Sequence, residues 1–217
     1  MDQVGNLLDR PRFYYNVDGL GELGGGVMCL GLALLLWLPM RSSANSVWHR
    51  ISFFAFVSLI LVIHYGAKAV KTRITYPRTG YVEYRKRWQT RTIGAALCAL
   101  TTAGLAIGFR RHWDISALVP LTGLAFAASH GYHFARAVRW KWGTVGAMAA
   151  ASIAIAFLPA DVLGALGSES PAHPDRANLL GAVLLSLLVY GGLLLISGGI
   201  SLWLYLRRTQ PPAQEGQ

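Results

Sequence analysis

Charged residues are scarce in this sequence. They make up 14% of the 217 residues, while apolar residues make up 53%. A soluble globular domain carries about 25% charged residues, so this composition excludes an ordinary soluble fold. The few charges form short clusters between apolar runs of about 20 residues, the length of a helix that crosses a bilayer. The sequence therefore predicts an all-α integral membrane protein.

Acidic residues are also few. The chain has 10 Asp and Glu against 20 Lys and Arg, which gives a formal net charge of +10. A basic chain can bind nucleic acid, but here the charges are divided among short connectors between apolar runs. The partner that we predict is the bilayer with its anionic head groups, and not nucleic acid.

Cysteine and catalytic motifs are nearly absent. The two cysteines, Cys29 and Cys98, each lie inside an apolar run, where cysteine packs as a small hydrophobic residue and a disulfide is not expected. The sequence contains no phosphate-binding P-loop, no GxSxG, no HExxH and no GxGxxG after a strand. These absences favour a protein that is not an enzyme, with no catalytic residue.

The apolar runs predict six transmembrane helices. The last run is longer than one span needs, so we expect it to tilt, to bend near Gly191-Gly192 or Gly198-Gly199, or to emerge from the membrane. An interfacial segment over residues 1–18 should precede the bundle, a basic loop should cover 71–91, and 207–217 should be a disordered tail. The predicted spans are 19–40, 51–70, 92–109, 115–135, 143–163 and 179–206.

The basic residues predict the orientation. With six spans, fourteen of the twenty Lys and Arg residues fall on the side that holds both termini, the 71–91 loop and the 136–142 connector. The opposite loops hold five. Basic residues accumulate in cytoplasmic loops, so both termini are predicted to be cytoplasmic.

The first span begins with a glycine-rich stretch. Gly21 and Gly25 have the spacing of two small residues on one helix face, which lets another helix approach closely. This contact face could serve packing within the chain, a homo-oligomer or a protein partner.

Four ionisable residues lie at similar depth in the first two spans. Asp18 and Glu22 are one helical turn apart at the start of span one, and His64 and Lys68 lie near the end of span two. Because consecutive spans are antiparallel, we predict an ion pair between Glu22 and Lys68. Such a pair could be purely structural, or Lys68 could reach the interface alone, but an ionisable residue inside a membrane is also a functional-site hypothesis.

Two histidines lie together in the fourth span. His130 and His133 share a helix face with Arg136. Two imidazoles at this spacing can bind a metal and, with His64, could suggest haem. No cysteine or carboxylate is spaced to complete a zinc site, so we predict hydrogen-bonded histidines of the bundle, with no metal and no cofactor.

One part of the basic loop has the composition of a defined turn. Proline fixes φ at one corner and glycine permits a positive φ at another, and aromatic residues flank both. We expect this turn to hold its arginine near the head groups. It should also cover a polar cluster formed by the ionisable residues named above, Asp18, Glu22, His64, Lys68, His130 and His133. The residues concerned are Tyr76, Pro77, Arg78, Gly80 and Tyr81.

Two stretches carry a resemblance to a known family. DGLGE ends the segment Tyr14–Glu22, and RITYPRTGYVEYR covers Arg73–Arg85. Together they resemble a family of uncharacterised prokaryotic multi-span membrane proteins. The resemblance implies a multi-pass protein of the prokaryotic plasma membrane and implies no activity.

Three functions follow as hypotheses. The leading one is a non-enzymatic membrane protein whose cytoplasmic-side polar cluster and basic loop bind an anionic head group or a partner protein. The first alternative is a small transporter or permease that uses the intramembrane Glu, Lys and His residues. The second is a membrane-embedded enzyme that modifies lipid, which would need an acid/base pair open to a lateral groove.

Overall fold

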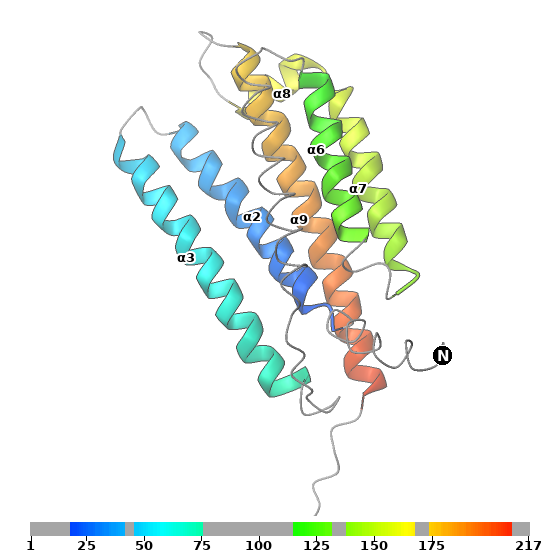
Figure 1. Ribbon diagram of the computed structural model, residues 1–217. Coiled ribbons are helices and arrows are strands. Elements are labelled where there is room, and N and C mark those ends of the chain that lie inside the picture. The colour runs from blue at the N-terminus through cyan, green and yellow to red at the C-terminus, as the bar shows by residue number, and fades with distance from the viewer. Residues whose placement is uncertain (1–17, 42–45, 76–114, 132–137, 168–173, 210–217) are drawn as a thin grey trace, which may run out of the picture.

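The described part of the protein is helical throughout. The computed structural model describes residues 18–41, 46–75, 115–131, 138–167 and 174–209, and every regular element within these ranges is a helix (Figure 1). This confirms the all-α prediction for these ranges. The elements are α2 (Leu20–Arg41), α3 (Ser46–Val70), η1 (Lys71–Thr75), α6 (Ile115–His130), α7 (Lys141–Ala156), α8 (Ala160–Gly167) and α9 (Pro174–Arg208).

Two of these helices are long and apolar enough to cross a membrane. They are α2 over Leu20–Leu38 and α9 over Asn178–Arg208, and α7 with α8 would make a third if the bent pair is one span. The described residues therefore contain two or three candidate spans, which agrees with membrane association. The predicted span 92–109 lies outside the described residues.

The helices run alongside one another in alternating directions (Figure 1). Helices α2 and α7 begin, and α3, α6 and α9 end, at the same end of the bundle, whereas α8 lies at the other. We call the first of these the basic end, because exposed basic residues lie at or beside those helix ends. They are Lys68, Arg73, Arg139, Arg207 and Arg208.

Glycines bring α2 and α9 into close contact. A Cβ atom on Gly26 would lie 2.9 Å from the carbonyl oxygen of Gly191, and one on Gly198 would lie 2.9 Å from that of Gly19. The two glycines on each helix are seven residues apart, so they face each other twice along an antiparallel pair. The close approaches between this part of the chain and α9 thus involve Gly19 and Gly26, whereas at Gly25, which was predicted for this role, a Cβ would make only an ordinary contact of 3.4 Å.

A polar contact joins α7 to α9 further from the basic end. The Ser152 hydroxyl donates to the carbonyl oxygen of Met148 at 2.7 Å, and Ser152 Oγ also bonds to the Tyr190 hydroxyl. Because the serine proton is already used, the tyrosine must be the donor in the second bond. A Cβ on Gly123 of α6 would collide with both side chains, so the glycine allows all three helices to meet here.

The predicted fifth span is divided in the structure. Helix α7 ends at Ala156, α8 begins at Ala160, and the two axes differ by 102°. Pro159 lies between them, and proline lacks the N–H that would continue a helix and clashes with the preceding turn. Its carbonyl oxygen instead accepts bonds from Val162 and Leu163 at 3.1 and 3.2 Å, which start α8 in its new direction.

Two other boundaries differ from the prediction. Helix α9 is a single helix of 35 residues, about 52 Å long at 1.5 Å per residue, so it exceeds a hydrocarbon core without a break at either glycine pair. Residues 71–75, predicted as the start of the basic loop, form the π-helical turn η1 that continues α3. Gly191 and Gly198 lie within this unbroken helix and pack against Leu30 and Leu23 of α2.

Candidate functional site

The first polar cluster is built around Asp18, the residue that leads into α2. Its side chain is fully buried. Oδ1 accepts a bond from the backbone N–H of Leu20 at 3.2 Å, which satisfies one of the free donors at the helix start. Between them Gly19 has a φ of +72°, a conformation that glycine adopts without strain.

The other oxygen of Asp18 binds η1. Oδ2 accepts a bond from the Thr75 hydroxyl at 3.1 Å and lies 3.6 Å from Lys71 Nζ. Lys71 and Thr75 are both buried. The hydroxyl of Tyr205, on α9, donates to the carbonyl oxygen of Thr75 at 3.1 Å. We call Asp18, Lys71, Thr75 and Tyr205 the Asp18 cluster. This cluster joins the start of α2 to η1 and to the last turns of α9.

The second polar cluster surrounds Glu22, one helical turn along α2. Oε2 lies 2.7 Å from Lys141 Nζ, at the first residue of α7, and Oε1 lies 3.2 Å from His130 Nε2, at the last residue of α6. Two hydroxyls of α9 complete the set. Ser197 donates to Oε1 at 3.0 Å and Ser201 donates to Oε2 at 3.2 Å. We call these five residues the Glu22 cluster.

Each oxygen of Glu22 thus faces two groups that can donate protons. An ionised carboxylate only accepts hydrogen bonds, so the Lys141 ammonium and the two serine hydroxyls are its donors, and His130 Nε2 lies within ion-pair distance of Oε1. Glu22 and Lys141 both have side chains with no exposed surface. Isolated buried charges are strongly unfavourable, and this carboxylate and ammonium satisfy each other with three further polar groups around them.

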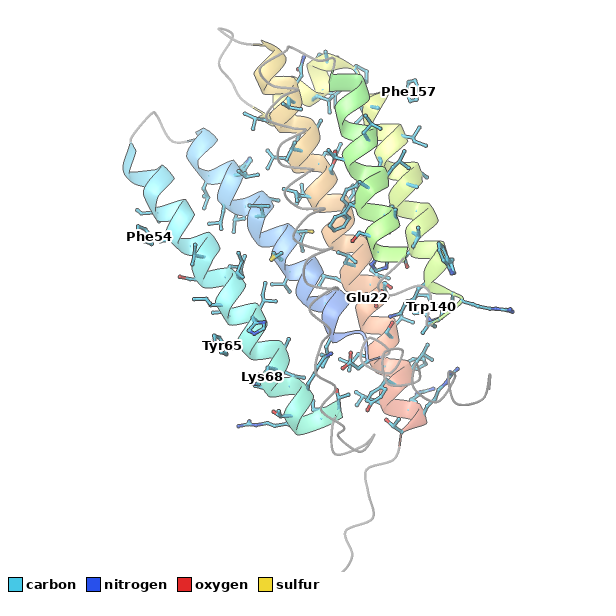
Figure 2. All side chains as sticks on the ribbon, viewed as in Figure 1. Glu22, Phe54, Tyr65, Lys68, Trp140 and Phe157 are labelled. Atoms are coloured by element: carbon cyan, nitrogen blue, oxygen red, sulfur yellow. The ribbon has the colours of Figure 1, made fainter. Side chains whose placement is uncertain are left out.

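The predicted ion pair between Glu22 and Lys68 is wrong. Lys68 is exposed on the outer side of α3, whereas Glu22 points into the bundle where α2 meets α9 (Figure 2). Its cationic partner is Lys141. Helix α9 lies beside α2 on the side away from α3, so the carboxylate faces α9 and the α6–α7 pair and not the first hairpin.

Lys141 was missed because it lies in a run that looks like an interfacial connector. It follows Arg139 and Trp140 in the 136–142 connector, where basic residues are explained by the orientation of the chain in the membrane. A signal was nevertheless present. The buried residues of α7 recur at helical spacing from Lys141 through Met148 to Ser152, and extending the apolar face of that helix back to its start would have placed Lys141 on it.

The hydroxyl groups of α9 were also missed. Ser197, Ser201 and Tyr205 follow one another at intervals of four residues and are all buried. In a helix this spacing places them in one row. Such a row of polar side chains in an otherwise apolar run was the available signal, since hydroxyls in a membrane helix usually bond to another helix.

The remaining predicted residues divide into two groups. His64 is exposed on α3, where its ring makes an edge contact with Tyr65 at 5.5 Å between centroids, so His64 and Lys68 join neither cluster. The other predicted residues lie outside the described residues, and their role stays a prediction. They are Tyr76, Pro77, Arg78, Gly80, Tyr81, His133 and Arg136.

The two sequence stretches that carry the family resemblance meet in the Asp18 cluster. Asp18 belongs to DGLGE, Thr75 belongs to RITYPRTGYVEYR, and the two side chains share a hydrogen bond. Within the described ranges, no group of three or more His, Cys, Asp or Glu residues could hold a metal ion. Comparisons of the chain with protein-family models, curated proteins and solved structures find no match.

Proposed function

We propose that this chain is a non-enzymatic, six-span protein of a prokaryotic plasma membrane, with both termini in the cytoplasm, whose basic end binds anionic lipid head groups. The distribution of basic residues supports this orientation. The span count is supported by the positions of two elements: η1 ends at the basic end and α6 begins at the opposite end. These positions are what a third span over the predicted run 92–109 requires.

One observation carries the head-group proposal. At the basic end, the exposed charged side chains among the described residues are all cationic: Lys68, Arg73, Arg139, Arg207 and Arg208. The two described carboxylates at this end, Asp18 and Glu22, are fully buried and face Lys71 and Lys141. Among the residues that the structure describes, the exposed charge at this end is therefore all basic, and each basic residue near an anionic membrane contributes about 1 kcal/mol of attraction.

Aromatic residues accompany these cations. Trp140 and Trp142 are exposed beside the start of α7, and Arg207 lies over the ring of Trp203, 4.1 Å from its centroid. Tryptophan is enriched at the level of the head groups, where its apolar ring can contact acyl chains while its N–H reaches water or polar head groups. These residues support placing the basic end at the membrane surface.

The Asp18 cluster holds the residue that precedes the predicted turn over Tyr76–Tyr81, which we call the YPRTGY turn. Thr75 is the residue before Tyr76, and its hydroxyl and carbonyl oxygen are held by Asp18 and Tyr205. The turn therefore starts from an anchored point at the basic end. This supports the proposal that Arg78 adds to the head-group site, and it leaves a partner protein as the second ligand that the turn could serve.

The burial of Glu22 favours head-group binding over the two alternatives. A transporter needs its ionisable residues to reach a water-filled path, and a lipid-modifying enzyme needs an acid/base pair open to a groove. Glu22, His130 and Lys141 are instead buried and directed at one another. An oligomer through the glycine-rich first span also gains less support, because Gly19 and Gly26 already contact α9 of the same chain.

Spin-labelled lipids test the proposal. We would reconstitute the protein in phosphatidylcholine vesicles and compare its association with spin-labelled phosphatidylglycerol and phosphatidylcholine. The variant Arg73→Gln/Arg208→Gln removes two exposed charges on two different elements, and Arg73→Lys/Arg208→Lys is the matched control. From the attraction per basic residue, we expect a preference for phosphatidylglycerol that falls at least about threefold in the glutamine variant, is kept in the lysine variant and weakens with salt.

Two results would contradict the head-group proposal. One is a wild-type protein that associates equally with both lipids. The other is a preference that the glutamine and lysine variants reduce to the same extent, since this would attribute the effect to arginine contacts within the protein and not to charge.

A further inference from the structure

Helix α8 lies across the end of the bundle opposite the basic end. Helix α7 has 16 residues, about 24 Å at 1.5 Å per residue, which is less than the roughly 30 Å of a hydrocarbon core. The chain then turns by 102° into α8 (Figure 1). A helix at this angle to a helix that stands in a membrane runs close to the plane of the bilayer.

One side of α8 is fixed against α9. Leu163 and Gly167 are buried, and Leu163 packs with Leu179 and Ala182 of α9. A Cβ on Gly181 would collide with the carbonyl oxygen of Leu163, so the two backbones are in direct contact. The orientation of α8 is therefore set by packing, and its other side faces outward in a defined way.

The exposed surface of α8 has an apolar flank and a polar flank. Val162 and Leu166 are 43% and 42% exposed and lie four residues apart, so they share one flank. Asp161 is exposed and lies about 100° around the helix from Val162, on the side away from Leu166. Ala165, also exposed, lies on the same side as Asp161.

Helix α7, which precedes the bend, also carries a stripe of exposed apolar residues. Trp142, Ile153 and Phe157 are exposed at 53%, 47% and 83%, and Phe157 is the most exposed large hydrophobic residue in the described ranges. Figure 2 shows the Phe157 side chain projecting away from the bundle at the end where α8 lies. The stripe thus runs along α7 from an aromatic residue at the basic end to another at the bend.

We propose that α8 is an in-plane interfacial helix of the leaflet opposite the basic end, with Phe157, Val162 and Leu166 inserted at the boundary between head groups and acyl chains and with Asp161 facing water. An apolar flank beside a polar one is the pattern of helices that lie in a membrane interface. The partner is the bilayer, because α8 directly follows α7, whose exposed apolar residues extend to Phe157 beside the bend. This inference rests on the proposal that α7 stands in the membrane.

Spin labels at single cysteines test the depth of α8. In a background with Cys29→Ala and Cys98→Ala, the substitutions Val162→Cys and Leu166→Cys report the apolar flank, and Asp161→Cys and Ala165→Cys report the polar flank as matched controls. Ile153→Cys on α7 is the reference for a lipid-facing site. The protein is reconstituted in phosphatidylcholine vesicles, and accessibility to oxygen is compared with accessibility to a water-soluble nickel chelate.

We expect the ratio of oxygen to chelate accessibility to be several-fold higher at positions 162 and 166 than at 161 and 165. Equal chelate access on both flanks, with Ile153→Cys still lipid-exposed, would overturn the inference and leave the membrane proposal intact. Protection of all four positions from chelate would also overturn it, because α8 would then be a re-entrant segment within the hydrocarbon. Chelate access at position 153 would contradict the membrane proposal itself.

Discussion

Asp18 precedes α2 and Glu22 lies in its first turn, yet the two acids connect different parts of the molecule. Asp18 binds Lys71 and Thr75 on η1, the continuation of the helix that follows α2 in the chain. Glu22 binds side chains of α6, α7 and α9, all more than 100 residues away. The first cluster therefore closes the α2–α3 hairpin at the basic end, and the second joins three distant helices to α2.

The clusters also differ in the strength of their ion pairs. Lys141 lies 2.7 Å from Glu22 and is fully buried, whereas Lys71 lies 3.6 Å from Asp18 and keeps slight exposure. A buried pair is costly to break, because the remaining charge has no partner and no water. The two acids are therefore expected to have unequal roles. Glu22 should contribute to the stability of the whole bundle, and Asp18 to that of the basic end.

The largest expected effect is that of Glu22→Gln. The substitution leaves Lys141 buried without a carboxylate, which costs about 3 kcal/mol of unfolding free energy, the lower end of the range for such pairs because a lysine at the start of a helix can partly turn toward the interface. The measurement is the free energy of unfolding in mixed micelles.

The double variant Glu22→Gln/Lys141→Met is the control for this prediction. It removes both charges, so most of the lost stability should return. If the double variant were as unstable as the sum of the two single variants, the ion pair would contribute nothing and the contrast between the two clusters would be lost.

A smaller effect is expected at Asp18. The variant Asp18→Ala removes the acceptor for Leu20 N–H and for the Thr75 hydroxyl, whereas Asp18→Asn keeps an acceptor at the helix start. We expect the alanine variant to be less stable than the asparagine variant by about 1 kcal/mol, the usual value of such a cap. Amide hydrogen exchange should rise at the first turn of α2 and in η1, while exchange in α6 and α7 stays unchanged. Equal exchange increases throughout the bundle would show that the Asp18 cluster is not local.

The smallest effect is expected for Tyr205→Phe. It removes one hydrogen bond, to the carbonyl oxygen of Thr75, and interhelical hydrogen bonds in membranes average about 0.6 kcal/mol. Tyr65→Phe on the exposed face of α3 is the matched control and should leave unfolding unchanged. Hydrogen exchange at η1 should be faster in Tyr205→Phe alone, and a loss as large as that of Glu22→Gln would reverse the ranking of the clusters.

Helix positions were largely predictable, and the exceptions have local causes. Apolar runs bounded by charges located α2, α3 and α9 to within five residues at each end, because a membrane span requires a long apolar helix. The division of the fifth run was missed although Pro159 is visible in the sequence. Proline near the end of an apolar run is compatible with a terminated helix and with a kinked one, and only the packing of Leu163 against α9 selects the sharp turn.

Three ionisable residues of the two clusters were predictable, and their partners were not. Asp18, Glu22 and His130 were identified because an ionisable side chain in an apolar run needs a partner. Their partners depended on which helix neighbours which. Adjacent spans in the sequence suggested Lys68 for Glu22, but the contact between α2 and α9, made close by Gly19, Gly26, Gly191 and Gly198, directs the carboxylate to Lys141.

The helical class and the candidate spans follow from the sequence alone, because each long apolar run favours a helix of membrane-spanning length independently of the others. The sequence also identifies Asp18 and Glu22 as buried acids that need cationic or hydrogen-bonding partners. Which residues serve as those partners depends on the tertiary structure, since the order of the helices in space is set by the fit of their surfaces. In that arrangement Glu22 joins α2 to α6, α7 and α9, and Asp18 holds the residue from which the YPRTGY turn begins.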